Sequence, residues 1–392
     1  MNDHDTSNRT ASHTDRLDVL VAGGGVAGLE AAFALRELAG DRVRVTLLAA
    51  AEDYVERAWS VGEPFSSSHA DRFSLARLAA QAEAELVHDS LVGVDVARRT
   101  AHTAGGLQID YDALLVGVGA STHEMFEHAT HVDDGRMDEL LHGLVQDVEG
   151  GLVRRLAIVV PAPMPWPFPA YELALMASER AWDMQADMDI ILLTPERAPL
   201  EIFGAPASRA LSELLAGRRI ELVTSAYCEI PRAQMVVAHP RGRTIAADRV
   251  IALPQLRGPA LEGLPQDGGG FIPVDEYGQV RGVEGVWAAG DATDTPIKQG
   301  GVAAQLADTA ARAIAARAGA PLQVLPFAPV LEGVLMTGGT PRYLRHQPAS
   351  GTMAEESVFS EMARGAGRPK IATRYLEPQL RPDRSPTTAA SA

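Results

Sequence analysis

The chain has 392 residues, with 35 Lys and Arg against 51 Asp and Glu, which gives a formal net charge of −16. This length exceeds what one hydrophobic core usually supports, so we expect more than one domain. The acidic balance argues against nucleic acid and an anionic membrane surface as partners. Cys228 is the only cysteine, which excludes an internal disulfide or two-thiol redox centre and favours a reducing, cytoplasmic compartment.

Both ends of the chain are polar. Residues 1–15 lack the apolar core of a signal peptide, and nowhere do about 18 apolar residues run together. We therefore expect a soluble protein with a disordered tail over 1–15 and a loose tail over 379–392.

The first informative stretch is an apolar run from Leu17 to Ala22 that ends in a glycine-rich turn. Gly23, Gly25 and Gly28 fit G-x-G-x-x-G: the first permits the turn, the second lets a pyrophosphate approach, and the third lets helix and strand pack closely. A helical pattern follows over 26–38, and the free N–H groups at its start favour phosphate binding.

The second strand is predicted over 42–48, which completes a right-handed βαβ unit. A carboxylate that binds the ribose hydroxyls is expected at its end, but three alanines stand there, and Glu52 and Asp53 come slightly late. The ribose contact is therefore assigned to backbone, to one of these carboxylates, or to water.

The rest of the first domain has weaker patterns. Residues 54–65 are too irregular for an element and are predicted as a loop near the cofactor. Elsewhere we predict a helix over 74–83, a short strand over 84–87, a hairpin over 91–108, and a buried strand over 111–120 that ends in Gly117-Val118-Gly119.

Between residues 121 and 151 the periodicity fades, and the chain is predicted to cross between domains there. His123, His128 and His131 lie in this stretch. A metal site is one interpretation, but with no cysteine nearby and polar neighbours, solvated surface histidines are favoured.

A second strand-turn-helix unit begins at 154–160, so we predict a second nucleotide-type domain that repeats the first. Farther on, a buried strand over 285–289 leads into Gly290-Asp291, a helix over 302–316 has a glycine-marked start, and strand-like residues after 325 suggest a small C-terminal domain. The other elements predicted in the second unit are strands over 189–194, 220–223 and 250–254 and a helix over 208–217.

Four separated motifs occur in one order: the first glycine turn, Gly117-Val118-Gly119-Ala120, Gly290-Asp291 and Lys298-Gln299-Gly300-Gly301. Together they resemble the FAD oxidoreductases with two dinucleotide-binding domains, close to the sulfide:quinone oxidoreductase and type II NADH dehydrogenase group. The resemblance implies an α/β fold of two Rossmann-like domains, the second inserted in the first. The implied ranges are 16–122 with 272–325 for the FAD domain, 150–271 for the second domain, and 326–378 for the small C-terminal domain.

In such proteins the first turn holds the FAD pyrophosphate, and the aspartate matching Asp291 bonds the ribityl chain or phosphate. Its alternative is an ordinary capping aspartate. Lys298 would place a positive charge where electrons accumulate on the flavin; its alternative is a solvated surface lysine. The FAD contacts assigned on this basis are Gly23, Gly25, Val26, Ala27, Gly28, Ala50, Arg57, Leu91, Gly117, Gly119, Gly290, Asp291, Gln299 and Gly300.

The second unit departs from the family. Five prolines and the bulky Trp166 and Phe168 lie between 161 and 169, where a nicotinamide nucleotide would need glycines and N–H donors. A conventional NAD(P)H site is therefore not favoured. Glu196 is either a residue that selects NADH or a surface glutamate.

Two further family features are missing. The sulfide:quinone oxidoreductases work through a pair of cysteines, whereas Cys228 stands alone, so we do not expect cysteine-based sulfide chemistry. After Gly339 no sustained apolar helical face appears, so stable membrane insertion is not expected either.

We predict a soluble FAD-dependent oxidoreductase that passes electrons from an unidentified donor to a quinone-like or other small acceptor. Two alternatives stay open: an NAD(P)H dehydrogenase with an altered nucleotide site, and a flavin-binding sensor or interaction module without turnover. Glu172 and Lys298 are the predicted catalytic residues, and helix capping is an equally weighted interpretation of Glu172. No nucleic-acid partner and no metal are expected, and a homodimer is left open.

Overall fold

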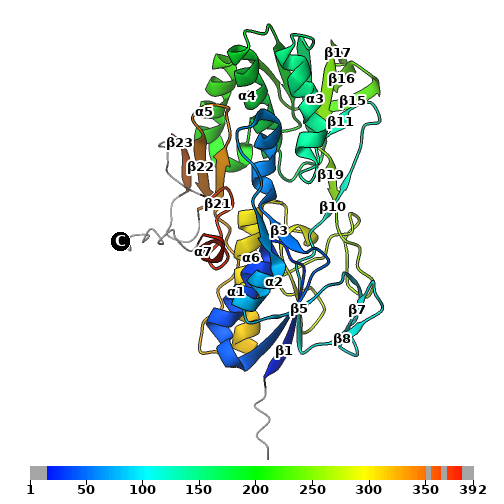
Figure 1. Ribbon diagram of the computed structural model, residues 1–392, viewed down its shortest axis with the longest axis vertical. Helices are drawn as coiled ribbons and strands as arrows, with labels where there is room; N and C mark the ends of the chain where they lie inside the picture. Colours follow the sequence, from blue (N-terminus) through cyan, green and yellow to red (C-terminus); the bar gives the residue numbers. More distant parts are fainter. Residues whose placement is uncertain (1–15, 350–354, 363–368, 382–392) are drawn as a thin grey trace, which may run out of the picture.

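The computed structural model describes residues 16–349, 355–362 and 369–381. Two α/β units lie end to end, each built on a five-stranded parallel sheet (Figure 1). The first sheet has the order β20-β9-β1-β2-β5, with bounds Val286–Ala288, Ala113–Val116, Leu17–Ala22, Val43–Leu48 and Glu85–Val87. The second has the order β11-β18-β12-β13-β14, with bounds Thr130–His131, Arg249–Ala252, Arg155–Val159, Asp189–Leu193 and Ile220–Val223.

The two sheets repeat one plan. In each sheet, the strand that leads into the turn and helix is central: β1 in the first and β12 in the second. On one side of it lie β2 and β5 in the first sheet and β13 and β14 in the second. On the other side lie β9 and β20 in the first sheet and β18 and β11 in the second. This doubling matches the predicted repeat. The helices are α1 (Val26–Ala39), α2 (Leu75–Gln81) and α6 (Gly300–Arg317) in the first unit, and α3 (Met137–Glu149), α4 (Phe168–Asp183) and α5 (Gly204–Gly217) in the second.

The chain passes between the units on two adjacent strands. β10 (Ser121–His123) leaves the first unit and pairs antiparallel with β19 (Gln255–Arg257), which returns to it. Because β20 then joins the first sheet beside β9, the first unit is built from two separated stretches of sequence.

Smaller sheets complete the molecule. A three-stranded antiparallel sheet of β21, β22 and β23 lies between α5 and α7 in Figure 1. Its bounds are Leu331–Leu335, Arg342–Gln347 and Glu356–Glu361, and α7 spans Glu377–Leu380. The others are β3 (Asp53–Val55) with β4 (Arg72–Ser74), β6 (Leu91–Asp95) with β7 (Thr100–Thr103) and β8 (Gln108–Asp110), and β15 (Tyr227–Arg232) with β16 (Met235–His239) and β17 (Arg243–Ala246).

Apolar strands and helix faces form one core in the first unit and a large core in the second, and a smaller core lies between the second sheet and the β15–β17 sheet. The first-unit core also takes Tyr375, Leu376 and Leu380 from the C-terminal segment, and the second-unit core takes Val61 from the first unit. These two cores therefore contain residues from distant parts of the chain, which fixes the two units against each other.

The prediction of an irregular loop over 54–65 is wrong. Residues Arg57–Phe65 form a 3-10 helix, and β3 precedes it. A tight helix with Pro64 inside carries no 3.6-residue periodicity, so the sequence pattern did not reveal it. The helix packs against α3 and α4 of the second unit.

The fading pattern over 121–151 also misled the prediction. The 13-residue helix α3 lies there, and β11 joins the second sheet, so that sheet draws on residues well before 150. His131 is buried and its Nε2 accepts a hydrogen bond from the Phe126 N–H at 3.2 Å, so it is not a solvated surface histidine. Within the described residues, no group of His, Cys, Asp or Glu is arranged to hold a metal ion.

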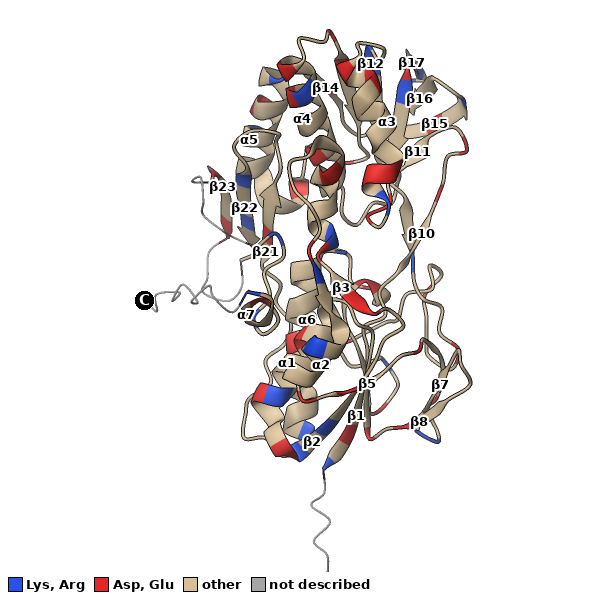
Figure 2. Ribbon diagram, in the orientation of Figure 1, with Lys and Arg blue, Asp and Glu red and all other residues tan. Residues whose placement is uncertain are grey.

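Charged positions are spread over the outer elements of both units rather than gathered on one of them (Figure 2). None of the helices in the described ranges combines the length and apolar character needed to cross a bilayer. Leu380, the last residue of α7, is buried, so the chain is packed up to the end of that helix. The predicted tail over 1–15 and the part of the predicted tail 379–392 after residue 381 lie outside the described residues.

Candidate functional site

A cavity of about 680 Å³ lies between the two units. The carboxyl ends of β1 and β2 and the start of α1 form one part of its wall. The other part comes from the 3-10 helix 57–65, the start of α4, β21 and residues 370–371. Carboxyl ends of parallel strands are where open α/β sheets bind ligands, so this position is the natural site.

The first glycine turn is tight at two points and open at one. A Cβ on Gly23, whose φ is +124°, would lie 2.2 Å from the Gly117 carbonyl oxygen, and a Cβ on Gly28 would lie 1.8 Å from that of Gly23. A Cβ on Gly25, by contrast, would meet no atom within 4 Å. Gly25 caps the N-terminus of α1 and lines the cavity, so free space faces the N–H groups of that helix. A pyrophosphate fits this cradle.

Asp291 and Lys298 lie together on the wall near α6. Burial raises the pKa of the Asp291 carboxyl, and the Lys298 ammonium opposes that shift. Lys298 is 7% exposed; its Nζ donates to the Thr293 carbonyl oxygen and lies 4.1 Å from the centroid of the Phe271 ring. Burial lowers the pKa of Lys298 to about 8, with Asp291 opposing. Lys298 is therefore a buried cation at the cavity, not a solvated surface lysine.

Glu172 reaches the cavity from the second turn of α4 and is 2% exposed. Its Oε1 accepts the Met336 N–H at 2.9 Å, and the Lys370 Nζ lies 2.8 Å from Oε1 and 3.1 Å from Oε2. Burial raises the pKa of this carboxyl, and Lys370 opposes the shift. Glu172 thus makes a buried ion pair and does more than cap its helix.

Lys298 and Lys370 are the only lysines in a chain with 35 basic residues, and both line this cavity. Arginine serves every other basic position. Unlike a guanidinium, an ammonium loses its proton readily when buried. Both lysines of the chain therefore lie at one cavity, where an ammonium and a guanidinium would behave differently.

An aromatic cluster fills the turn between β12 and α4. The Trp166 and Phe168 rings stack with centroids 5.0 Å apart, and both pack near Phe203. A Cβ on Gly333 of β21 would lie 2.9 Å from the Phe168 ring, so the C-terminal sheet closes over this cluster. Trp166 and Phe168 line the cavity and give it one flat apolar wall.

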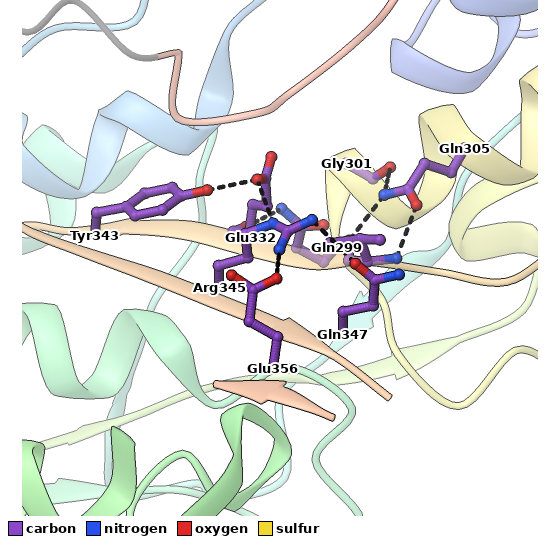
Figure 3. Close-up of polar contacts among 9 residues, drawn as sticks. Gln299, Gly301, Gln305, Glu332, Tyr343, Arg345, Gln347 and Glu356 are labelled. Atoms are coloured by element: carbon purple, nitrogen blue, oxygen red, sulfur yellow. Dashed lines mark hydrogen bonds and ion pairs between the residues drawn. The ribbon is translucent and has the colours of Figure 1, made fainter. Parts of the chain in front are cut away.

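Polar contacts join the C-terminal sheet to the start of α6 (Figure 3). The Gln299 side chain accepts the Val302 N–H at 2.8 Å and donates to the Glu332 carbonyl oxygen at 3.3 Å. The Glu332 carboxylate in turn contacts Tyr343 and Arg345 of β22. These contacts hold β21 against the N-terminus of α6, and both elements line the cavity.

Known proteins share this architecture. Residues 169–313 match the family model described as pyridine nucleotide-disulphide oxidoreductase. Over 308 residues, the chain is 25% identical to apoptosis-inducing factor 3 of Mus musculus; the match covers 74% of this chain and 47% of the relative, so the chain spans about half of that protein's length.

Two solved structures show the same fold. The sulfide:quinone oxidoreductase of the hyperthermophilic bacterium Aquifex aeolicus superposes with a TM-score of 0.74 at 19% identity, covering 88% of this chain and 87% of that one. A ferredoxin reductase of Rhodopseudomonas palustris gives a TM-score of 0.62 at 19% identity, with 86% and 84% covered. The chain has the fold of these two structures. The predicted fold class is thereby confirmed, and FAD binding stays a prediction.

The fold brings most of the predicted site residues to one cavity. Those that line it are Gly23, Gly25, Val26, Ala50, Arg57, Leu91, Glu172, Asp291, Lys298, Gln299 and Gly300. Ala27, Gly28, Gly117, Gly119 and Gly290 are not among its lining residues. Gly28 and Gly117 instead lie behind the turn, where their backbones pack closely. Asp53 also lines the cavity, whereas Glu52 does not.

Two charged lining residues, Asp134 and Lys370, are among those that were not predicted. Asp134 lies in the loop before α3 and is exposed to solvent. The scarcity of lysine was the one sequence signal that could have identified Lys370.

Glu196 and Cys228 lie elsewhere. Glu196 is half-buried, and its Oε2 accepts hydrogen bonds from the Tyr171 hydroxyl at 2.6 Å and the Thr194 hydroxyl at 2.8 Å, so the prediction of a surface glutamate is wrong. Cys228 lies on β15, packed against the small core beside that sheet, and burial raises its pKa to about 12.

Proposed function

We propose that this protein is an oxidoreductase that passes electrons through FAD to a small, flat, quinone-like acceptor, and that Glu172, Lys370 and Lys298 handle the accompanying charge. One observation carries the proposal: a buried Glu172–Lys370 pair and a buried Lys298 line the same cavity as the open phosphate-binding turn.

The glycine turn and Asp291 would hold the cofactor, and bound FAD would supply two-electron chemistry. Burial raises the pKa of the Glu172 carboxyl, so this group holds a proton more readily than an exposed glutamate and can serve as a proton donor or acceptor. Lys370 contacts both carboxylate oxygens, so it can stabilise the ionised form after a proton leaves. Lys298 supplies positive charge from the other side of the cavity.

The flat wall of Trp166 and Phe168 supports an aromatic acceptor. Aromatic rings stack on one another with a gain beyond that of simple burial. The same residues argue against NAD(P)H, because bulky rings and prolines occupy the turn where a pyrophosphate needs N–H donors. Glu196, which could have bound a ribose, is instead engaged by Tyr171.

Cys228 supports a reaction without thiol chemistry. A thiolate is the reactive form of cysteine, and a pKa of about 12 leaves this thiol protonated at neutral pH. Cys228 is also not among the cavity-lining residues.

Anaerobic stopped-flow absorbance tests the proposal in two experiments, one on reduction of the flavin and one on its reoxidation. The holoprotein is mixed with NADH, NADPH, sulfide or a reduced quinol, and separately the dithionite-reduced holoprotein is mixed with a short-chain benzoquinone. We expect fast reoxidation by benzoquinone, slowed about 10-fold or more in Glu172→Gln, and slow reduction by both nucleotides. The matched control is Glu179→Gln, farther along α4.

Two outcomes would contradict the proposal. Rapid bleaching by micromolar NADH or NADPH would favour a dehydrogenase with an altered nucleotide site. Failure of every donor and acceptor to change the flavin spectrum would favour a flavin-binding module without turnover.

A further inference from the structure

Glu30 is a buried carboxylate that binds the C-terminal segment of the chain. It lies in the second turn of α1 and is 1% exposed. Its Oε1 accepts the N–H groups of Arg374 and Tyr375 at 2.7 and 3.0 Å, and its Oε2 accepts those of Tyr375 and Leu376 at 3.1 and 2.8 Å. One side chain therefore satisfies three consecutive backbone donors.

The segment bound in this way leads to the cavity. Tyr375 and Leu376 are buried in the core of the first unit, and Arg312 donates to the Tyr375 hydroxyl at 2.9 Å. Toward the N-terminus of the segment, Ile371 packs against Gly300, where a Cβ would lie 2.6 Å from the isoleucine Cδ1. Lys370, the next residue, is the one that pairs with Glu172.

A buried carboxylate at position 30 lowers the stability of the fold unless hydrogen bonds compensate for the water that it loses. Removal of water raises the pKa of Glu30, the three backbone N–H groups oppose the shift, and the nearby Asp308 carboxylate adds to the rise. An apolar side chain could fill the same volume. Only an acceptor with two oxygens can fix the backbone of residues 374–376 through hydrogen bonds.

We propose that Glu30 is a positioning residue that holds residues 370–376 so that the Lys370 ammonium reaches Glu172 across the interface between the units. Its consequence for turnover rests on the proposed function of the Glu172 site. The positioning itself is independent of turnover and can be measured without it.

Acylation of lysine tests the positioning directly. The holoprotein receives a short pulse of an acetyl N-hydroxysuccinimide ester, and modification of Lys298 and Lys370 is read by mass spectrometry. In Glu30→Gln we expect Lys370 to react about 10-fold faster, because its segment opens more often, while Lys298 reacts at the wild-type rate. Glu37→Gln, an exposed position on the same helix, is the matched control and should change neither rate.

Equal rises at both lysines would reflect general loosening and would overturn the proposal, as would an unchanged Lys370 rate. If Glu30→Gln does not fold, two glycines inserted between Ile371 and Ala372 decide the matter. The insertion leaves the Glu30 contacts intact but frees Lys370, so it should raise acylation of Lys370 alone; an unchanged rate overturns the proposal.

Kinetics separate this inference from the proposed function. If Lys370 acylation rises while Glu172→Gln and Lys370→Met reoxidise at wild-type rates, the proposed function fails and the positioning stands. If those two variants are slow while Lys370 acylation is unchanged in Glu30→Gln, the proposed function stands and the positioning fails.

Discussion

Replacing Lys370 by methionine removes one partner of the buried ion pair and leaves the Glu172 carboxylate behind. The two side chains are 6% and 2% exposed, and the ammonium lies 2.8 Å from the nearer carboxylate oxygen. Breaking a buried pair on one side costs about 3–5 kcal/mol of stability when the remaining group stays charged. That figure is an upper bound here, because Glu172 can take up a proton instead.

The sign of the pH dependence follows from the raised pKa of Glu172. A carboxyl whose pKa is higher in the folded than in the unfolded state contributes stability that is present below its unfolded pKa and is lost as pH rises through the folded one. Without Lys370, the folded pKa rises further. The stability deficit of Lys370→Met should therefore be small near pH 5 and grow toward about 3–5 kcal/mol by pH 8.

Urea unfolding of the FAD-loaded protein at the two pH values, followed by circular dichroism, measures this deficit. The control is the double variant Glu172→Gln with Lys370→Met, which removes both charges and should recover most of the lost stability at pH 8. An equal deficit at both pH values, or no recovery in the double variant, would refute the reasoning.

Three further predictions concern the cofactor and its surroundings. Gly25→Val should fold but purify without the flavin absorbance, because its added atoms enter open space that the pyrophosphate needs, whereas Gly28→Val should fail to fold since its Cβ meets the backbone of the turn. Lys298→Met should keep FAD but slow flavin reduction about 10-fold or more, and it should abolish an inflection near pH 8 in the wild-type rate, above which the ammonium loses its proton. Cys228→Ser should leave flavin turnover unchanged in stopped-flow assays, and a loss of activity would show that the thiol takes part.

The parts of the site that sequence predicts are those encoded in a few consecutive residues. The turn at Gly23–Gly28 follows from its glycine spacing, and Asp291 and Lys298 follow from motifs that resemble those of the FAD oxidoreductases. Strand, turn and helix are local structures, so local patterns are enough to place them at the carboxyl edge of a sheet.

Contacts between distant segments could not be predicted in the same way. Glu172 and Lys370 are separated by 198 residues, and Glu30 meets its backbone partners 344 or more residues away. Residues 369–376 have no periodicity that would indicate burial. A glutamate normally lies at the protein surface, so the sequence contains no sign that Glu30 and Glu196 are turned inward.

The two units show how one strand order can serve two purposes. In the first, Gly25 leaves open space before α1, and the unit keeps its capacity to bind a phosphate. In the second, Trp166 and Phe168 fill the equivalent turn before α4, and the helix instead carries Glu172 into the cavity of its neighbour. In the second unit, bulky side chains therefore close the turn at the helix start, and the helix places a buried carboxylate whose cation comes from elsewhere. Here Lys370 supplies that cation from the C-terminal segment, so the site is complete only when both units and this segment are packed together.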